Sequence, residues 1–330
     1  MQARAKRKRD SAQHQECAQP AGEDGAAMTE SHAIETYDLT KRYGRFEAVG
    51  SLSLRVGAGR ITGFLGRNGA GKSSAIKMLL GIIRPSSGTG VVLGRHIDDA
   101  RQSRESRRHV AYVAEDKQTY AYMTVAQMIA FTRSFYDDWG VDIEQRLIKR
   151  FELPFQRKVK ALSKGMRTKL ALLLALARHP QLLILDDPSE GLDPVSIEEL
   201  LQALVAAAAE GTSVFFSSHQ IAEVERVADQ VCIIDHGRLV ADTSLDQIRQ
   251  EYRRITFGFS TEPPRVDFTG ESIGAVRTDG RQITVVATRN ADAIIERVHR
   301  LGAASVETTP VSLRELFLAT VQEESHDALV

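Results

Sequence analysis

The sequence predicts an α/β fold in which helices cover both faces of a mainly parallel sheet. Three short apolar segments indicate this class, at residues 182–185, 214–216 and 231–234. The sequence between them has helical character. Short, fully apolar strands that alternate with helices are typical of a parallel sheet buried on both faces.

In the first part of the chain, the pattern predicts half-buried strands, followed by a turn and a helix. Residues 33–37 and 51–56 alternate apolar and polar side chains, as half-buried strands do. Residues 61–65 form an apolar strand that leads into a glycine-rich turn. Residues 72–80 then continue as a helix that ends at Gly81.

Residues 123–165 are expected to be mostly helical. Thr124 and Gln127 have the T-x-x-Q spacing of a capping box, in which the two side chains satisfy free backbone N–H groups at a helix start. An apolar stripe follows at helical spacing. It consists of Val125, Met128, Ile129 and Phe131.

A composition break follows Gln250, so we expect one domain over residues 31–250 and a small accessory α/β domain over 251–330. A hairpin is predicted around Asp279-Gly280. Ser312 and Glu315 are expected to cap a last helix. Between the hairpin and this last helix, an amphipathic helix is marked by Ile294, Ile295, Val298 and Leu301. His299 lies on its polar side and is expected at the surface.

Residues 1–30 are expected to form a disordered, solvated tail, because few large apolar residues are present to be buried. A basic run over residues 4–9 leaves contact with nucleic acid or anionic lipid open. Patterned sequence starts at Met28, and we expect Met28 to be the true initiator. Mass spectrometry of the native N-terminus tests this, because peptides from residues 2–27 would contradict it.

Composition excludes several classes of protein. The 330 residues carry 43 Lys+Arg and 43 Asp+Glu, so no global positive charge predicts a nucleic-acid clamp. The longest apolar run, residues 170–177, is too short to cross a bilayer. The basic start is not followed by the apolar segment that a secretory signal peptide contains, so a secretory signal is not expected. Cys17 and Cys232 lie far apart, which fits a reducing cytosol without disulfides or cysteine metal sites.

Residues 66–73, GRNGAGKS, match the phosphate-loop pattern G-x-x-x-x-G-K-[ST] in full. Glycines let backbone N–H groups turn toward an anion, and the helix start adds free N–H donors and a positive dipole end. Lys72 supplies a charge for the β- and γ-phosphates. The Ser73 hydroxyl is a candidate Mg²⁺ ligand. The alternative is a glycine-rich turn without a ligand.

Two carboxylates, Asp186 and Asp187, follow the apolar strand 182–185. An acidic residue at the carboxyl end of a strand, beside a phosphate loop, can hold Mg²⁺ through water. The alternative is an aspartate that ends the strand and caps the next helix. The phosphate loop favours the metal-binding interpretation.

The segment between these motifs resembles the ABC ATPase family. Residues 162–166, LSKGM, resemble the LSGGQ signature and open a strongly helical run. Four further motifs follow the family's order over roughly residues 33–240. They are the adenine-stacking aromatic at Tyr43, the glutamine loop at Glu115, the D-loop GLDP at 191–194 and the switch histidine of SSH at 217–219. The strongest likeness is to the ATPase subunits of drug- and polyketide-type exporters, whose permease is a separate polypeptide.

The resemblance implies a P-loop NTPase fold with an antiparallel β subdomain and a helical subdomain at about residues 115–165. It implies an ATP-hydrolysing subunit at the cytoplasmic face of the membrane, pairing with a second copy or another ABC subunit to drive a permease. Asp187, His219 and Lys72 would be catalytic, and Ser73, Asp186 and Glu115 would hold Mg²⁺. ATP would contact Tyr43, Gly66, Asn68, Gly69, Ala70, Gly71, Lys72, Ser73, Ser74, Ser163, Gly165 and Asp193, with Ser163 and the Gly165 N–H reaching the γ-phosphate across the dimer.

Three differences from the family pattern involve four positions. Asp187 stands where the family usually has Glu, and its shorter side chain leaves slow hydrolysis or an ATP-holding role open. Glu115 replaces Gln, which improves metal binding but adds charge near the γ-phosphate. Lys164 and Met166 replace Gly and Gln of the signature, and Lys164 either adds a favourable charge or is only solvated.

Other functions and other roles stay open on the sequence alone. A soluble ABC protein acting on nucleic acid or ribosomes would usually carry tandem cassettes or long coiled coils, which are not found, and no nucleic acid is expected. A phosphate-loop kinase or GTPase would lack the signature and the switch histidine. Tyr120, Tyr122 and Met123 predict either the surface that receives a permease helix or ordinary core. The accessory domain is compatible with a regulatory or dimer-supporting role by analogy alone.

Overall fold

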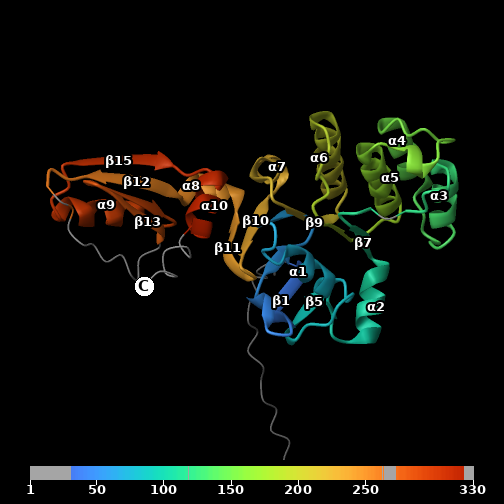
Figure 1. Ribbon diagram of the computed structural model, residues 1–330, viewed down its shortest axis with the longest axis horizontal. Coiled ribbons are helices and arrows are strands. Elements are labelled where there is room, and N and C mark those ends of the chain that lie inside the picture. The colour runs from blue at the N-terminus through green and yellow to red at the C-terminus, as the bar shows by residue number, and fades with distance from the viewer. Residues whose placement is uncertain (1–30, 118, 262, 264–272, 323–330) are drawn as a thin grey trace, which may run out of the picture. The chain divides into compact units, whose positions relative to one another are not determined.

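The computed structural model describes residues 31–117, 119–261, 263 and 273–322 (Figure 1). The expected tail over residues 1–30 and the proposed initiator Met28 lie outside the described residues. Among the described residues, no helix combines the length and the apolar character that a membrane span requires.

A six-stranded sheet forms the centre of the first domain, and it is mainly parallel, as the apolar segments predict. Its strand order is β11-β10-β4-β9-β8-β7, and β11 is antiparallel to β10 while the other neighbours are parallel. The strands are β4 (Ile61–Leu65), β7 (Val110–Val113), β8 (Leu182–Leu185), β9 (Ser213–Ser218), β10 (Gln230–Asp235) and β11 (Arg238–Ser244).

Both faces of this sheet are buried. Side chains alternate along a strand, and in β8 Leu183 and Leu185 join one apolar cluster while Leu182 and Ile184 join another. Both sides of the strand therefore face helices, which explains why it is apolar throughout. The helices around the sheet include α1 (Lys72–Leu79), α2 (Ala100–Arg108), α6 (Pro194–Ala209), α7 (Ile221–Val227) and α8 (Leu245–Glu251).

A second, antiparallel sheet contains the first strands of the chain. It has the order β2-β1-β5-β6, with β3 also paired to β1. The predicted strand over residues 51–56 is wrong in one respect, because it is divided between β2 and β3. Ser51 has a φ of +48°, and the bend carries the chain from one half of β1 to the other. The strands are β1 (His32–Tyr43), β2 (Phe46–Leu52), β3 (Arg55–Gly57), β5 (Ser87–Val92) and β6 (Arg95–His96).

The segment predicted as helical contains α3 (Val125–Arg133), α4 (Val141–Arg150), a 3₁₀ turn and the start of α5 (Lys164–Leu176). The capping box at the start of α3 is confirmed. The Thr124 hydroxyl accepts from the Gln127 N–H at 3.2 Å, and the Gln127 side chain accepts from the Thr124 N–H at 2.9 Å.

The described residues after 252 form a four-stranded sheet with the order β13-β14-β12-β15. The predicted hairpin turns at Gly280, with a φ of +55°, and the Ser312–Glu315 cap is present. The elements are β12 (Arg253–Gly258), β13 (Ile273–Asp279), β14 (Gln282–Ala287), α9 (Ala291–Arg300), β15 (Ser305–Pro310) and α10 (Leu313–Gln322). Leu313 and Leu316 pack into a cluster that also holds Ile248. The domain boundary near residue 250 stays a prediction.

Candidate nucleotide-binding site

The phosphate loop joins β4 to α1, and its backbone requires glycine at two positions. Gly69 has a φ of +84° and Gly71 a φ of +105°, in the left-handed region where a side chain is strained. A Cβ atom on Gly71 would also collide with the backbone carbonyl of Ala48. Helix α1 starts at Lys72, so its free N–H groups lie at the loop, as the motif requires.

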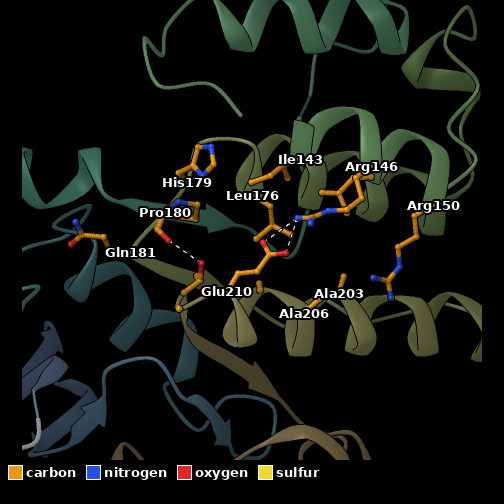
Figure 2. A pocket seen from close by; sticks show the side chains of 14 residues that line it. Ile143, Arg146, Arg150, Leu176, His179, Pro180, Gln181, Ala203, Ala206 and Glu210 are labelled. Atoms are coloured by element: carbon orange, nitrogen blue, oxygen red, sulfur yellow. Dashed lines mark hydrogen bonds and ion pairs between the residues drawn. The ribbon is translucent and has the colours of Figure 1, made fainter. Parts of the chain in front are cut away.

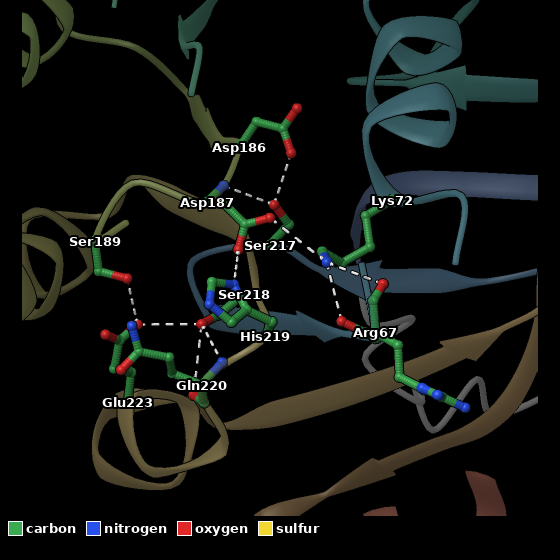
Figure 3. Close-up of polar contacts among 11 residues, drawn as sticks. Arg67, Lys72, Asp186, Asp187, Ser189, Ser217, Ser218, His219, Gln220 and Glu223 are labelled. Atoms are coloured by element: carbon green, nitrogen blue, oxygen red, sulfur yellow. Dashed lines mark hydrogen bonds and ion pairs between the residues drawn. The ribbon is translucent and has the colours of Figure 1, made fainter. Parts of the chain in front are cut away.

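Lys72 is the buried cation of this loop, with a relative exposure of 5%. Its ammonium group donates to the carbonyl of Gly66 at 2.9 Å and to that of Arg67 at 3.4 Å. A carboxylate oxygen of Asp187 lies 3.5 Å away (Figure 3). The ammonium is therefore held within the loop, where a polyphosphate would meet it.

Ser217 connects the two predicted carboxylates at the ends of neighbouring strands. Its hydroxyl donates to Asp186 Oδ1 at 2.8 Å and accepts from the backbone N–H of Asp187 at 2.8 Å (Figure 3). Because β8 and β9 are parallel neighbours, their carboxyl ends lie at one edge of the sheet. Ser217 was expected only as part of the switch motif.

The same sheet edge brings His219 to Asp187. Nδ1 of His219 lies 3.0 Å from Oδ1 of Asp187, so the ring donates to the carboxylate when this nitrogen carries the proton. Asp187 is buried and has a φ of +40°, a conformation that aspartate tolerates better than most residues. Lys72, Asp187 and His219 therefore lie together.

A pocket of about 420 Å³ lies over the phosphate loop and contains most of the predicted site. Its lining residues are Phe46, Ala48, Arg67, Asn68, Gly69, Gly71, Lys72, Ser73, Ser74, Glu115, Asp187, Glu190 and His219. A second pocket contains all three predicted metal ligands, Ser73, Glu115 and Asp186. Their hydroxyl and carboxylate oxygens are donors that Mg²⁺ prefers.

Seven predicted residues do not line the phosphate-loop pocket. Gly66 and Ala70 belong to the loop itself, Asp186 lines the second pocket, and the others are Tyr43, Ser163, Gly165 and Asp193. Tyr43 is half exposed, with its ring centroid 5.1 Å from the Lys41 ammonium. Phe46 lines the pocket and pairs with Tyr43 across the β1–β2 hairpin, which puts both rings on one face. The hairpin pattern could have pointed to Phe46. The adenine-stacking role of Tyr43 stays a prediction.

Ser163, Gly165 and Asp193 lie at helix starts outside the phosphate-loop pocket. Ser163 caps α5, with its hydroxyl accepting from the Met166 N–H at 3.2 Å, and Gly165 follows in the first turn. Asp193 caps α6 by accepting from the Ser196 N–H at 3.0 Å. Ser163 is exposed, and the first-turn N–H groups of a helix are suited to bind an anion.

Glu190 was missed by the sequence analysis. It lines the phosphate-loop pocket beside Glu115. A hydrogen bond with Glu190 raises the pKa of Glu115, and partial desolvation and the surrounding carboxylates raise it further, although the residue is exposed overall. Two carboxyl groups that hydrogen-bond to one another share a proton more readily than they both ionise. Burial and the nearby carboxylates, Asp186 first, also raise the pKa of Tyr112 to about 12, so its phenol stays neutral.

Another pocket lies away from these residues, between α4, the end of α5 and α6 (Figure 2). An ion pair between Arg146 and Glu210, at 2.8 Å, crosses it. In the described part of the chain, its lining includes no residue predicted for the nucleotide site.

Comparisons with known proteins agree with this geometry. Residues 49–190 match the family model described as ABC transporter. The bacitracin transport ATP-binding protein BcrA of Bacillus licheniformis is 34% identical over 227 residues, covering 68% of this chain and 74% of BcrA. The ABC transporter ATP-binding protein YtrB of Bacillus subtilis is 28% identical over 287 residues, covering 87% of this chain and 97% of YtrB.

Solved structures show the same fold. The ATP-binding subunit of an ABC transporter is 30% identical and superposes with a TM-score of 0.60, covering 66% of this chain and 92% of that one. The dimeric structure of MJ0796, a bacterial ABC transporter cassette, has a TM-score of 0.58 at 21% identity over 64% of this chain and 98% of that one, and supports the fold alone.

Proposed function

The chain belongs to the ATP-binding subunits of ABC transporters, and from this premise we propose that two copies close head to tail around two ATP molecules and two Mg²⁺ ions. Each nucleotide would rest on Lys72 of one copy and meet Ser163 of the other. The observation that carries this proposal is the assembly of Lys72, Asp187 and His219 at one phosphate loop.

The electrostatics of the two loops support the pairing. The phosphate loop and the start of α5 both present helix N-termini, whose free N–H groups and dipoles favour a polyanion. Two such ends facing one another require a negative charge between them. ATP would therefore stabilise the closed pair, and loss of its γ-phosphate would open it.

The residues around the γ-phosphate divide the chemistry among them. Asp187 takes the proton of the attacking water as general base, and the His219 ring positions Asp187 and contacts the phosphate. Ser73, Asp186 and Glu115 hold Mg²⁺. When bound, Mg²⁺ neutralises charge on the phosphate oxygens.

An ATP-dependent pairing experiment tests this arrangement. In Asp187→Asn, bound ATP should persist, and light scattering with ATP and Mg²⁺ should show a dimer. Lys72→Ala is the matched control, because without the buried ammonium it should neither bind ATP nor pair. Retained ATP affinity in Lys72→Ala, or parental hydrolysis in Asp187→Asn, would contradict the assignment.

We further propose that an exposed aromatic cluster contacts the permease. Tyr120, Tyr122 and Phe135 are exposed. Tyr120 contacts Tyr122 at a ring-centroid distance of 5.9 Å, and Phe131 contacts both Tyr120 and Phe135, at 5.3 and 5.0 Å. Aromatic residues are enriched at the cores of protein interfaces. The cluster follows Glu115 in the chain, so the same segment reaches from the nucleotide pocket to this surface.

The subunit would sit at the cytoplasmic face of the membrane through this contact and serve an exporter, as the likeness to bacitracin transport subunits suggests. Co-expression with a permease, sought among the neighbouring genes as a reading frame with several apolar spans, should bring the subunit into the membrane fraction. Tyr122→Asp should weaken that association and leave ATP binding intact. Equal recovery of Tyr122→Asp and the parent in membranes would contradict the role of this surface.

A further inference from the structure

One buried carboxylate connects the turn that carries Asp187 to the strand end that carries His219. Glu223 lies in α7 with a relative exposure of 5%. Its Oε2 atom accepts from the Ser189 hydroxyl at 2.6 Å and from the Ser218 hydroxyl at 3.1 Å (Figure 3). Ser189 follows Asp187 by two residues, and Ser218 directly precedes His219.

The other oxygen of Glu223 is unusual. Among the described residues, its buried Oε1 has no hydrogen-bond partner. Burying a carboxyl oxygen without a partner lowers the stability of the fold. An apolar residue would avoid this cost but would leave both serine hydroxyls without the acceptor they now share. The arrangement therefore points to a role in geometry rather than in stability.

We propose that Glu223 is a positioning residue for ATP hydrolysis, and that it fixes the spacing of Asp187 and His219 through Ser189 and Ser218. This inference rests on the proposed roles of Asp187 and His219. The direct contact between them is 3.0 Å, and Ser217, two residues before His219, accepts from the Asp187 N–H at 2.8 Å. Glu223 adds a connection that reaches both sides from a third element, α7.

The spacing of reacting groups has a large effect on turnover. Misplacement of a catalytic group by about 1 Å can lower the rate about a hundredfold. Loss of the Glu223 connection should therefore lower kcat and leave ATP affinity unchanged, because neither serine hydroxyl lines the phosphate-loop pocket.

Two substitutions at this position separate geometry from stability. Glu223→Gln keeps one oxygen that accepts from both serines, whereas Glu223→Ala removes it. We expect Glu223→Ala to lower kcat by about ten- to a hundredfold with an unchanged Kd for ATP. Glu223→Gln should keep kcat within about threefold of the parent, because its side-chain oxygen still accepts from the serines. Its buried amide should nevertheless lower the melting temperature.

Two further variants complete the experiment. Glu225→Ala, on the same helix, is the matched control and should keep the parental kcat. Ser189→Ala should lower kcat, and its combination with Glu223→Ala should lower kcat by less than the product of the single effects. All rates are divided by the number of ATP-binding sites, so that loss of folded protein does not count as loss of kcat.

The outcomes distinguish this inference from the proposed function. If Asp187→Asn is inactive and Glu223→Ala keeps the parental kcat, only the role of Glu223 is overturned. If Glu223→Gln loses as much kcat as Glu223→Ala, the hydrogen bonds from Ser189 and Ser218 do not explain the effect of Glu223 on kcat, and the inference fails. If Asp187→Asn hydrolyses ATP at the parental rate, the proposed catalytic site itself fails.

Discussion

Asp187 Oδ1 lies 3.0 Å from His219 Nδ1, although 32 positions separate the two residues in the chain. Two parallel neighbouring strands, β8 and β9, end at the same edge of the sheet and bring them together. The carboxylate also lies 3.5 Å from the Lys72 ammonium. Asp187 is therefore placed between the buried ammonium of the phosphate loop and the ring of His219.

We expect Asp187 and His219 to act as one unit. Asp187→Asn and His219→Ala should each lower kcat by about a hundredfold or more, which is the usual contribution of general-base catalysis. The double variant should lose little more than either single variant, because residues that act together are not additive. Steady-state ATPase assays with phosphate detection measure this. Multiplied losses in the double variant would contradict a shared function.

The composite site can be tested by mixing two inactive variants. Lys72→Ala removes phosphate binding, and Ser163→Asp keeps a cap for α5 but places a negative charge opposite the γ-phosphate. Each variant alone should hydrolyse ATP at most at a few per cent of the parental rate. A mixed dimer contains one site in which both residues are intact, so the mixture should regain activity. If it stays as inactive as its components, Lys72 and Ser163 do not form a site across the dimer.

The sequence predicted the parts of the site that come from local patterns. The loop of residues 66–73 is continuous in the chain, so its glycines and Lys72 indicate a phosphate site without knowledge of the fold. Asp186 and Asp187 could be placed because an apolar strand ends just before them. The parallel sheet could be predicted because strands buried on both faces are apolar throughout.

The residues that were missed depend on contacts between distant segments. Glu190 has no local feature that marks it, and only the fold places it beside Glu115 in the pocket. Glu223 resembles any helical glutamate until α7 packs against the turns that carry Ser189 and Ser218. The break between β2 and β3 depends on how the chain crosses β1, which alternation of side chains does not reveal.

The raised pKa of Glu115 predicts a pH dependence of stability. The hydrogen bond with Glu190 favours the protonated form, so the folded protein holds this proton to a higher pH than the unfolded chain, where the pKa is about 4.3. The stabilisation is complete below that value and is lost as the pH rises through the folded pKa. Glu115→Gln should therefore flatten the fall of the unfolding free energy with pH.

Denaturant unfolding at a series of pH values, without nucleotide, measures this slope. The change should be modest, because Glu115 is exposed and solvent screens its interactions. Glu152→Gln, at another exposed glutamate, is the matched control. A slope in Glu115→Gln equal to that of the parent would show that the carboxyl pair does not share a proton.

Glu144 should stabilise the helical subdomain through hydrogen bonds with two partners, Trp139 and Arg133. It is buried, and its carboxylate accepts from the Trp139 indole N–H at 2.6 Å and from the Arg133 guanidinium at 2.6 Å. Glu144→Ala leaves the indole N–H buried without its partner, which should lower the unfolding free energy by about 2 kcal/mol. Glu144→Gln keeps an acceptor for the indole and should lose about half as much.

Trp139 is the single tryptophan of the chain, so its fluorescence in a urea titration reports unfolding of this subdomain directly. Equal transition midpoints for Glu144→Ala and the parent would show that these bonds do not stabilise the subdomain.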